Sequence, residues 1–141
     1  MAAWSDCRKF DEFQLDENKK ILKGRAGVYQ FGYFHMGDFL PKYIGRVLWT
    51  GNGYDFYKRF LKYKNNAHNP KVAAKINAQR KMLWFRVMSV ADPAWTESRY
   101  LLMDRDAQGN FMTFEWNAVG SNYYDDYYRE DWRAYYSDSY K

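Results

Sequence analysis

Two neighbouring segments rich in β-forming residues constrain the fold of this chain more than any other feature. Residues 26–34 are dense in valine, tyrosine and phenylalanine, and a second short run, residues 42–48, begins directly after Pro41. Both compositions favour strands. Gly37 and Asp38 lie in the intervening stretch, where they favour a turn. The pattern therefore predicts an antiparallel hairpin.

The other regular elements follow from one apolar run and from helix-start signals. Residues 83–90 are apolar enough to form a third, central strand. Helices are expected where apolar residues recur at helical spacing, or where an Asn-Pro or Asp-Pro pair places a cap before a first-turn proline. They are predicted within residues 1–23 and over 54–64, 70–81 and 93–104. We therefore expect one α/β (α+β) domain, residues 1–141, with a small three-stranded antiparallel sheet flanked by helices.

The end of the chain is rich in tyrosine. Residues 122–141 hold seven tyrosines and one tryptophan, and Tyr124, Tyr128 and Trp132 recur every four residues. This spacing predicts an amphipathic helix or an aromatic tail. Because Tyr and Trp are enriched at protein interfaces, the segment is a candidate homodimer surface.

Composition excludes several classes of protein. Aromatic residues make up 21% of the 141 residues, far too many for a disordered chain. One cysteine, Cys7, cannot form an intramolecular disulfide framework. No segment approaches the ~18 uncharged apolar residues of a membrane span, and residues 1–23 lack the apolar region of a signal peptide. We expect a cytoplasmic protein with no membrane partner.

Positive charge is concentrated in the middle of the chain. Residues 42–86 carry eleven Lys or Arg and one acidic residue, Asp55, a net charge of +10, whereas the remaining residues carry eleven basic and sixteen acidic ones, a net charge of −5. This block is a candidate footprint for nucleic acid, or alternatively the solvated face of a helix. The nucleic-acid contacts predicted within it are Arg46, Lys58, Lys62, His68, Lys71 and Lys75.

Two tripeptides stand in corresponding places on the predicted hairpin. Gly-Val-Tyr, residues 27–29, lies on the first strand, and Tyr-Ile-Gly, residues 43–45, lies on the second. A basic helix, the central strand and a helix bearing Glu97 follow in order. This ordered set resembles the GIY-YIG nuclease family over about residues 25–120. The resemblance implies a metal-dependent endonuclease that hydrolyses phosphodiester bonds in DNA, with RNA not excluded.

The resemblance also implies roles for individual residues. Glu97 would hold Mg²⁺ (or Mn²⁺), Arg59 would bind a phosphate oxygen, and Tyr29 and Tyr43 would hold or deprotonate the attacking water. Deprotonation by a phenol requires neighbouring cations, such as Arg46 and Arg59, to lower its pKa from about 10. The implied catalytic residues are Tyr29, Tyr43, Arg59, Tyr63 and Glu97, and the implied supporting residues are Gly27, Gly45 and Asn117.

Each of these residues also has a plainer explanation. Strand tyrosines commonly pack in a core, a first-turn glutamate such as Glu97 interacts favourably with the helix dipole, and Arg59 could be an ordinary surface residue of a basic helix. His68 could shuttle protons or be a solvated loop residue. The alternative function is therefore a catalytically silent nucleic-acid-binding or protein-binding module on the same fold.

Overall fold

The predicted hairpin forms half of an antiparallel sheet in the computed structural model, which describes residues 2–48 and 53–117. The two hairpin strands pair from Gly27 opposite Val47 to His35 opposite Asp38. Met36 and Gly37 form the turn, both with positive φ, as tight two-residue hairpin turns require. The elements in order are β1 (Arg8–Lys9), η1 (Phe10–Glu12), α1 (Asp16–Leu22), β2 (Gly27–His35), β3 (Asp38–Val47), α2 (Phe56–Lys64), α3 (Pro70–Ala78), β4 (Trp84–Ser89) and α4 (Pro93–Met103).

The mixed α/β class is confirmed, but the predicted number of strands is wrong. The sheet has four strands in the order β1-β4-β2-β3, all antiparallel. The additional strand, β1, lies in a segment predicted to be partly helical, and it pairs only Arg8 with Phe85 and Lys9 with Trp84. A strand of two residues shows no alternation in the sequence, because alternation needs at least four residues to be recognised.

Pro41 lies within β3 instead of preceding it. The pairing of β2 with β3 shifts register between Phe31 and Gly32, and Pro41 lies opposite Gly32 at this irregularity. Because β3 is an edge strand, the missing N–H of proline removes no bond to a further strand. The strand β2 has nine residues, as predicted but shifted by one position, whereas β3 has ten residues and begins earlier than the sequence predicted.

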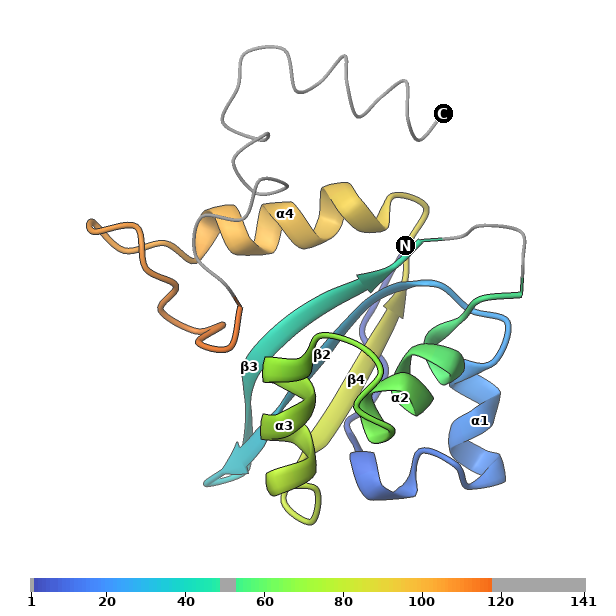
Figure 1. Cartoon of the computed structure of the whole chain (residues 1–141). Helices are drawn as coiled ribbons and strands as arrows, with labels where there is room; N and C mark the ends of the chain where they lie inside the picture. The colour runs from blue at the N-terminus through green and yellow to red at the C-terminus, as the bar shows by residue number, and fades with distance from the viewer. Residues whose placement is uncertain (1, 49–52, 118–141) are drawn as a thin grey trace.

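Helices cover both faces of the sheet (Figure 1). One face, here called the α2–α3 face, packs against α1, α2 and α3 around a core of aromatic rings that includes Phe31, Phe60 and Phe85. The opposite face, the α4 face, packs against α4 through Ile44 and Leu101. Side chains alternate between the two faces along each strand, so neighbouring residues of β3 serve different layers.

Two of the predicted helix starts are built by side-chain caps. Asn69, with φ of 43°, accepts a hydrogen bond from the Val72 N–H at the start of α3, and Pro70 occupies the first helical position. Asp55, which was not predicted as a cap, accepts from the Lys58 N–H at the start of α2. The cap bond predicted for Asp92 is absent, and its Oδ1 atom has no hydrogen-bond partner among the described residues.

The segment after α4 returns to the free edge of β3. The Asp104 carboxylate accepts hydrogen bonds from the N–H groups of Thr113 and Phe114 at 2.9 Å, which folds the chain back. The Asn117 side chain then bonds both backbone groups of Ile44, accepting from its N–H at 3.0 Å and donating to its carbonyl at 2.9 Å. Asn117 therefore holds the edge strand between Tyr43 and Gly45.

Within the two described ranges, no helix combines the length and the apolar content needed to cross a membrane. The helix or tail predicted at residues 122–141, and the homodimer surface assigned to it, lie outside the described residues.

Candidate active site

Three of the predicted tyrosines meet on the α2–α3 face. Tyr29 comes from β2, Tyr43 from β3 and Tyr63 from α2, and each pair of rings lies 6.1 to 6.4 Å apart between centroids. The hydroxyl oxygens of Tyr29 and Tyr63 are 2.7 Å apart, a hydrogen bond in which either can donate. The structure thus brings together residues separated by up to 34 positions in the chain, and we call them the tyrosine cluster.

The glycine of each tripeptide makes room for a neighbouring group. Gly45 lies opposite Tyr29 across the hairpin, and a Cβ atom there would overlap the Tyr29 ring and hydroxyl. Gly27 lies opposite Ser89, and a Cβ atom there would collide with the Met88 carbonyl oxygen. The two glycines have steric roles in this fold, and Gly45 allows the Tyr29 ring to lie flat against β3.

We expect Gly45→Ala to displace the Tyr29 ring and to destabilise the protein by about 1–3 kcal/mol, the usual cost of overpacking a core. Chemical denaturation monitored by circular dichroism measures this loss. The control is Gly37→Ala, because a Cβ atom added at Gly37 meets no neighbouring atom. The positive φ of Gly37 adds backbone strain to this variant. A Gly45→Ala variant as stable as the wild type would show that the Tyr29 ring does not depend on this gap.

Arg59 is anchored at the edge of the tyrosine cluster. Its Nη1 atom donates to the Tyr29 hydroxyl at 3.3 Å and to the Arg46 carbonyl at 2.8 Å, and its Nε atom donates to the Tyr54 hydroxyl at 2.9 Å. The guanidinium also lies over the Tyr54 ring, 5.3 Å from its centroid. The sequence pattern did not predict Tyr54 as a partner of Arg59.

Glu97 forms an ion pair beneath α4. Its Oε1 atom lies 2.8 Å from Nη1 of Arg46, and its side chain is 9% exposed. Arg46 joins this pair to the tyrosine cluster, because its own carbonyl accepts the hydrogen bond from Arg59. Burial raises the pKa of Glu97, while the nearby charges of Arg46 and Arg59 oppose that increase. The carboxylate, the guanidinium groups and the cluster therefore form one connected site across β3.

Burial decides the protonation of the phenols. It raises the pKa of Tyr29, of Tyr43 and of Tyr63, and the charge of Glu97 raises that of Tyr43 further. The positive charge of Arg59 lowers the pKa of Tyr29 and Tyr43, but desolvation outweighs it. The lowered pKa that a general-base role would require is therefore not found in the protein alone, and the phenols are neutral near pH 7.

The three phenols differ in their access to solvent. Tyr29 and Tyr63 are fully buried, whereas Tyr43 is 8% exposed and its hydroxyl accepts a hydrogen bond from Asn69 at 3.4 Å. The sequence reasoning identified Asn69 as a helix cap and missed this second contact. Among these phenols, Tyr43 is therefore the most exposed, and the Tyr29 hydroxyl accepts a hydrogen bond from Arg59.

The remaining predicted contacts surround the cluster. His68 packs edge-on against the Tyr63 ring, and burial with the charges of Arg59 and Lys62 lowers its pKa to about 4, so it is neutral near pH 7. Lys62 lies over the Tyr54 ring, 5.0 Å from its centroid. The lysines predicted to bind nucleic acid are exposed on the helices that cover this face: Lys58, Lys62, Lys71 and Lys75.

The donor set limits which metal ion could bind. No three His, Cys, Asp or Glu side chains gather anywhere in the described part of the chain. Glu97 lies close enough to raise the pKa of Tyr43, and Arg59 lies close enough to lower that of Glu97. One carboxylate fits Mg²⁺, which retains most of its water ligands, better than zinc, which needs three or four protein ligands.

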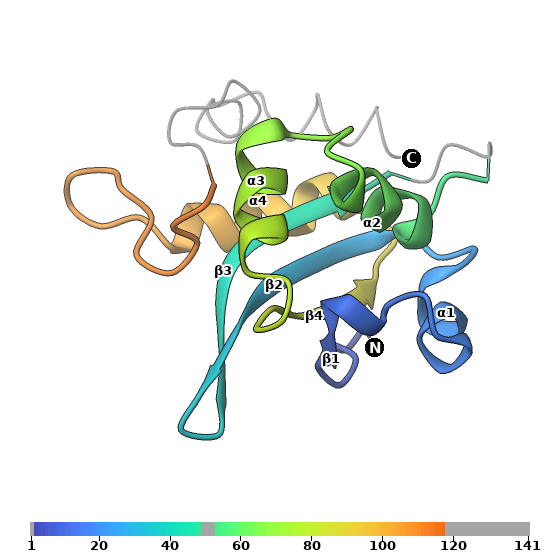
Figure 2. The same cartoon turned by 60° about the horizontal axis from the view of Figure 1, so that its bottom comes forward.

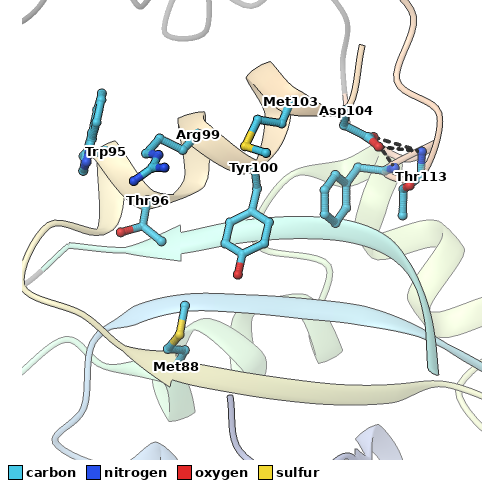
Figure 3. Close-up of a pocket in the computed structure, with 9 residues that line it drawn as sticks. Met88, Trp95, Thr96, Arg99, Tyr100, Met103, Asp104 and Thr113 are labelled. Atoms are coloured by element: carbon cyan, nitrogen blue, oxygen red, sulfur yellow. Dashed lines mark hydrogen bonds between the residues drawn. The ribbon is translucent and has the colours of Figure 1, made fainter. Parts of the chain in front are cut away.

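A cavity of about 600 Å³ lies away from this site, between α4 and the sheet. In Figure 3, Tyr100 points from α4 toward the sheet and Met88 rises from β4 below it. Asp104 and Thr113 close the far end through the hydrogen bonds described above. Asp104, a carboxylate in this lining, already accepts hydrogen bonds from the backbone N–H groups of Thr113 and Phe114, so the cavity adds no free carboxylate to the site at Glu97.

Comparison with models of protein families, with curated proteins and with solved structures found no match to this chain.

Proposed function

We propose that the chain is a metal-dependent endonuclease that hydrolyses phosphodiester bonds in DNA, with a fold similar to that of the GIY-YIG nucleases. One observation carries the proposal. Tyr29, Tyr43, Arg59 and Tyr63, which motif order alone selected, converge from three elements on the α2–α3 face, and Glu97 connects to them through Arg46. If these residues were unrelated members of the core, a selection by sequence order would not be expected to pick out residues that are hydrogen-bonded to one another.

Each residue of the site has a separate role in the proposed hydrolysis. Arg59 is the cation placed to bind a phosphate oxygen, because Tyr54 and the Arg46 carbonyl fix its planar group. Tyr43, whose pKa is raised by burial, would orient the attacking water through its hydroxyl. Glu97 would hold Mg²⁺, which when bound supplies charge stabilisation at the leaving oxygen.

Exposed lysines next to the cluster favour a polyanionic substrate. Lys58 and Lys62 lie on α2, and Lys71 and Lys75 lie on α3, the two helices that pack on the face of the tyrosine cluster. They belong to the segment of 42–86 whose net charge is +10. Ammonium groups on this surface would bind the phosphates of either DNA or RNA.

The second candidate is the catalytically silent binding module. The complete burial of Tyr29 and Tyr63 favours it, because the same contacts would also stabilise an ordinary core. A silent module can bind either nucleic acid or protein, and one that binds nucleic acid would resemble the nuclease in a binding measurement, so binding alone does not separate the two candidates. Cleavage does.

The test is a cleavage assay on supercoiled plasmid, single-stranded DNA and RNA, with Mg²⁺, with Mn²⁺ and with a chelator. We expect metal-dependent cutting of DNA by the wild type, and a decrease of ~10²-fold or more for Tyr43→Phe, which loses the hydroxyl that orients water. Tyr57→Phe is the matched control, since Tyr57 lies on α2 and its hydroxyl contacts only Gln14 among the described residues. If the folded wild type cuts none of these substrates, the endonuclease proposal is wrong and the catalytically silent module is the remaining candidate.

A further inference from the structure

The outer part of the α4 face carries a row of accessible aromatic rings. Phe34 on β2 lies 4.9 Å from Trp84 on β4 and 5.8 Å from Phe39 on β3, measured between ring centroids. Phe34 is 43% exposed, and the other two rings are partly exposed. Figure 2 shows why: the β2–β3 hairpin extends well beyond the helices at this end of the sheet. We call these three rings the aromatic platform.

Arg86 lies beside the platform, with its guanidinium group close to two aromatic rings and a buried amide. The Trp4 ring lies 4.7 Å from its Cζ atom and the Phe39 ring 5.0 Å from it, while its Nε atom donates to the buried Gln30 side chain at 2.8 Å. Three contacts therefore hold the group in place. Within the described part of the chain, no hydrogen bond engages its two terminal nitrogens, which can therefore bind an outside acceptor.

No carboxylate balances the charge of Arg86 among the described residues. Other arginines of the sheet and its surroundings do have such partners: Arg8 pairs with Asp6, Arg46 with Glu97 and Arg80 with Asp11. Burial lowers the pKa of Arg86, and the nearby groups that oppose this decrease, Cys7 and Tyr100, are not carboxylates. A half-buried, rigidly held cation without a counter-ion is suited to bind an anion.

A second cation borders the platform. The Nζ atom of Lys9 lies 5.8 Å from the centroid of the Trp84 ring, on the side of the neighbouring strand β1. The surface thus combines three exposed or half-exposed rings with two cations on one open sheet face. Flat rings that stack on bases, with cations that bind phosphates, are how sheet surfaces recognise single-stranded nucleic acid.

We propose that the aromatic platform and Arg86 form a second nucleic-acid site, which binds a single-stranded segment by stacking its bases on Phe34 and Trp84 and by pairing a phosphate with Arg86. The site lies on the sheet face opposite the tyrosine cluster, so it does not depend on the cleavage proposal. Charge complementarity selects this occupant: a second copy of the chain would have to supply a carboxylate to each Arg86.

The test measures binding of a fluorescently labelled oligothymidylate, about 12 nucleotides long, by anisotropy with a chelator present, so that cleavage is irrelevant. We expect Phe34→Ala and Arg86→Gln each to weaken binding about 10-fold or more, and Arg86→Gln to reduce the salt slope by about 0.7. Two control variants change an exposed apolar side chain and an exposed arginine outside the proposed site. Leu40→Ala removes a 42%-exposed side chain on the same hairpin, and Arg99→Gln removes an exposed arginine that lies over Trp95.

The results of this test distinguish a nucleic-acid site from a contact between two copies of the chain. Wild-type affinity in both Phe34→Ala and Arg86→Gln overturns the proposal, and so does an equal loss in all four variants. If Phe34→Ala instead converts a dimer to a monomer in sedimentation and leaves oligonucleotide affinity unchanged, the platform is a contact between copies of the chain and the proposal is wrong. Because Phe34 is exposed, its variant remains informative even if Arg86→Gln does not fold.

Discussion

Glu97→Gln is expected to abolish metal-dependent cleavage while the protein stays folded and still binds DNA. Glutamine keeps the size of the side chain and one carbonyl oxygen that can accept from Arg46, so the free energy of unfolding should change by only about 1 kcal/mol. The charge that would hold Mg²⁺ is lost. Single-turnover cleavage of a labelled duplex over a range of Mg²⁺ concentrations measures the effect.

Glu115→Gln is the matched control for Glu97→Gln. Glu115 also pairs with a basic residue, Lys42, at 3.4 Å, but its side chain is 57% exposed, and exposed pairs contribute little. We expect this variant to cut at the wild-type rate. Wild-type cleavage by Glu97→Gln at saturating Mg²⁺ would remove the carboxylate from the mechanism.

Arg59→Ala is expected to lower the cleavage rate by ~10²–10³-fold, the range for losing one donor to the transition state. The variant should also lose about 1–3 kcal/mol of stability, because the hydroxyls of Tyr29 and Tyr54 lose the same donor. Rates measured at saturating substrate, below the unfolding temperature of the variant, separate the two losses.

Lys58→Ala provides the comparison, since it removes a charge from the adjacent, exposed position of α2. We expect weaker DNA binding and a flatter salt dependence, with the rate at saturating substrate unchanged. If Lys58→Ala lowers the saturated rate and Arg59→Ala lowers only affinity, the assignment of the phosphate-binding cation on α2 is reversed.

Local signals predicted the elements that carry strong sequence patterns. The Asn69-Pro70 pair marks the start of α3 because the cap bond and the fixed φ of proline are both local. The hairpin follows in the same way from two β-rich segments and a glycine-containing turn. In contrast, β1 forms only because the edge of β4 is available to residues 8 and 9, which is a tertiary event with no local pattern.

The sequence could place Tyr29 and Tyr43 on strands, but it could not predict which of the two is more deeply buried. Alternation tells which face of a sheet a residue occupies and says nothing about depth. Depth decides the chemistry here, because Tyr29 is fully buried while Tyr43 reaches the surface. The same limit applies to the pKa values of the phenols. The cations near these tyrosines were visible in the sequence, and the desolvation that outweighs them was not.

The contacts of the segment after α4 have a consequence for association between chains. An edge strand normally offers a row of free N–H and C=O groups to any passing strand. On β3, the Asn117 amide occupies both groups of Ile44, the Trp116 N–H occupies the Lys42 carbonyl, and Pro41 has no N–H to offer. The edge is therefore closed to a foreign strand at three positions near its middle, which guards the long hairpin against the sheet-to-sheet growth that leads to aggregation.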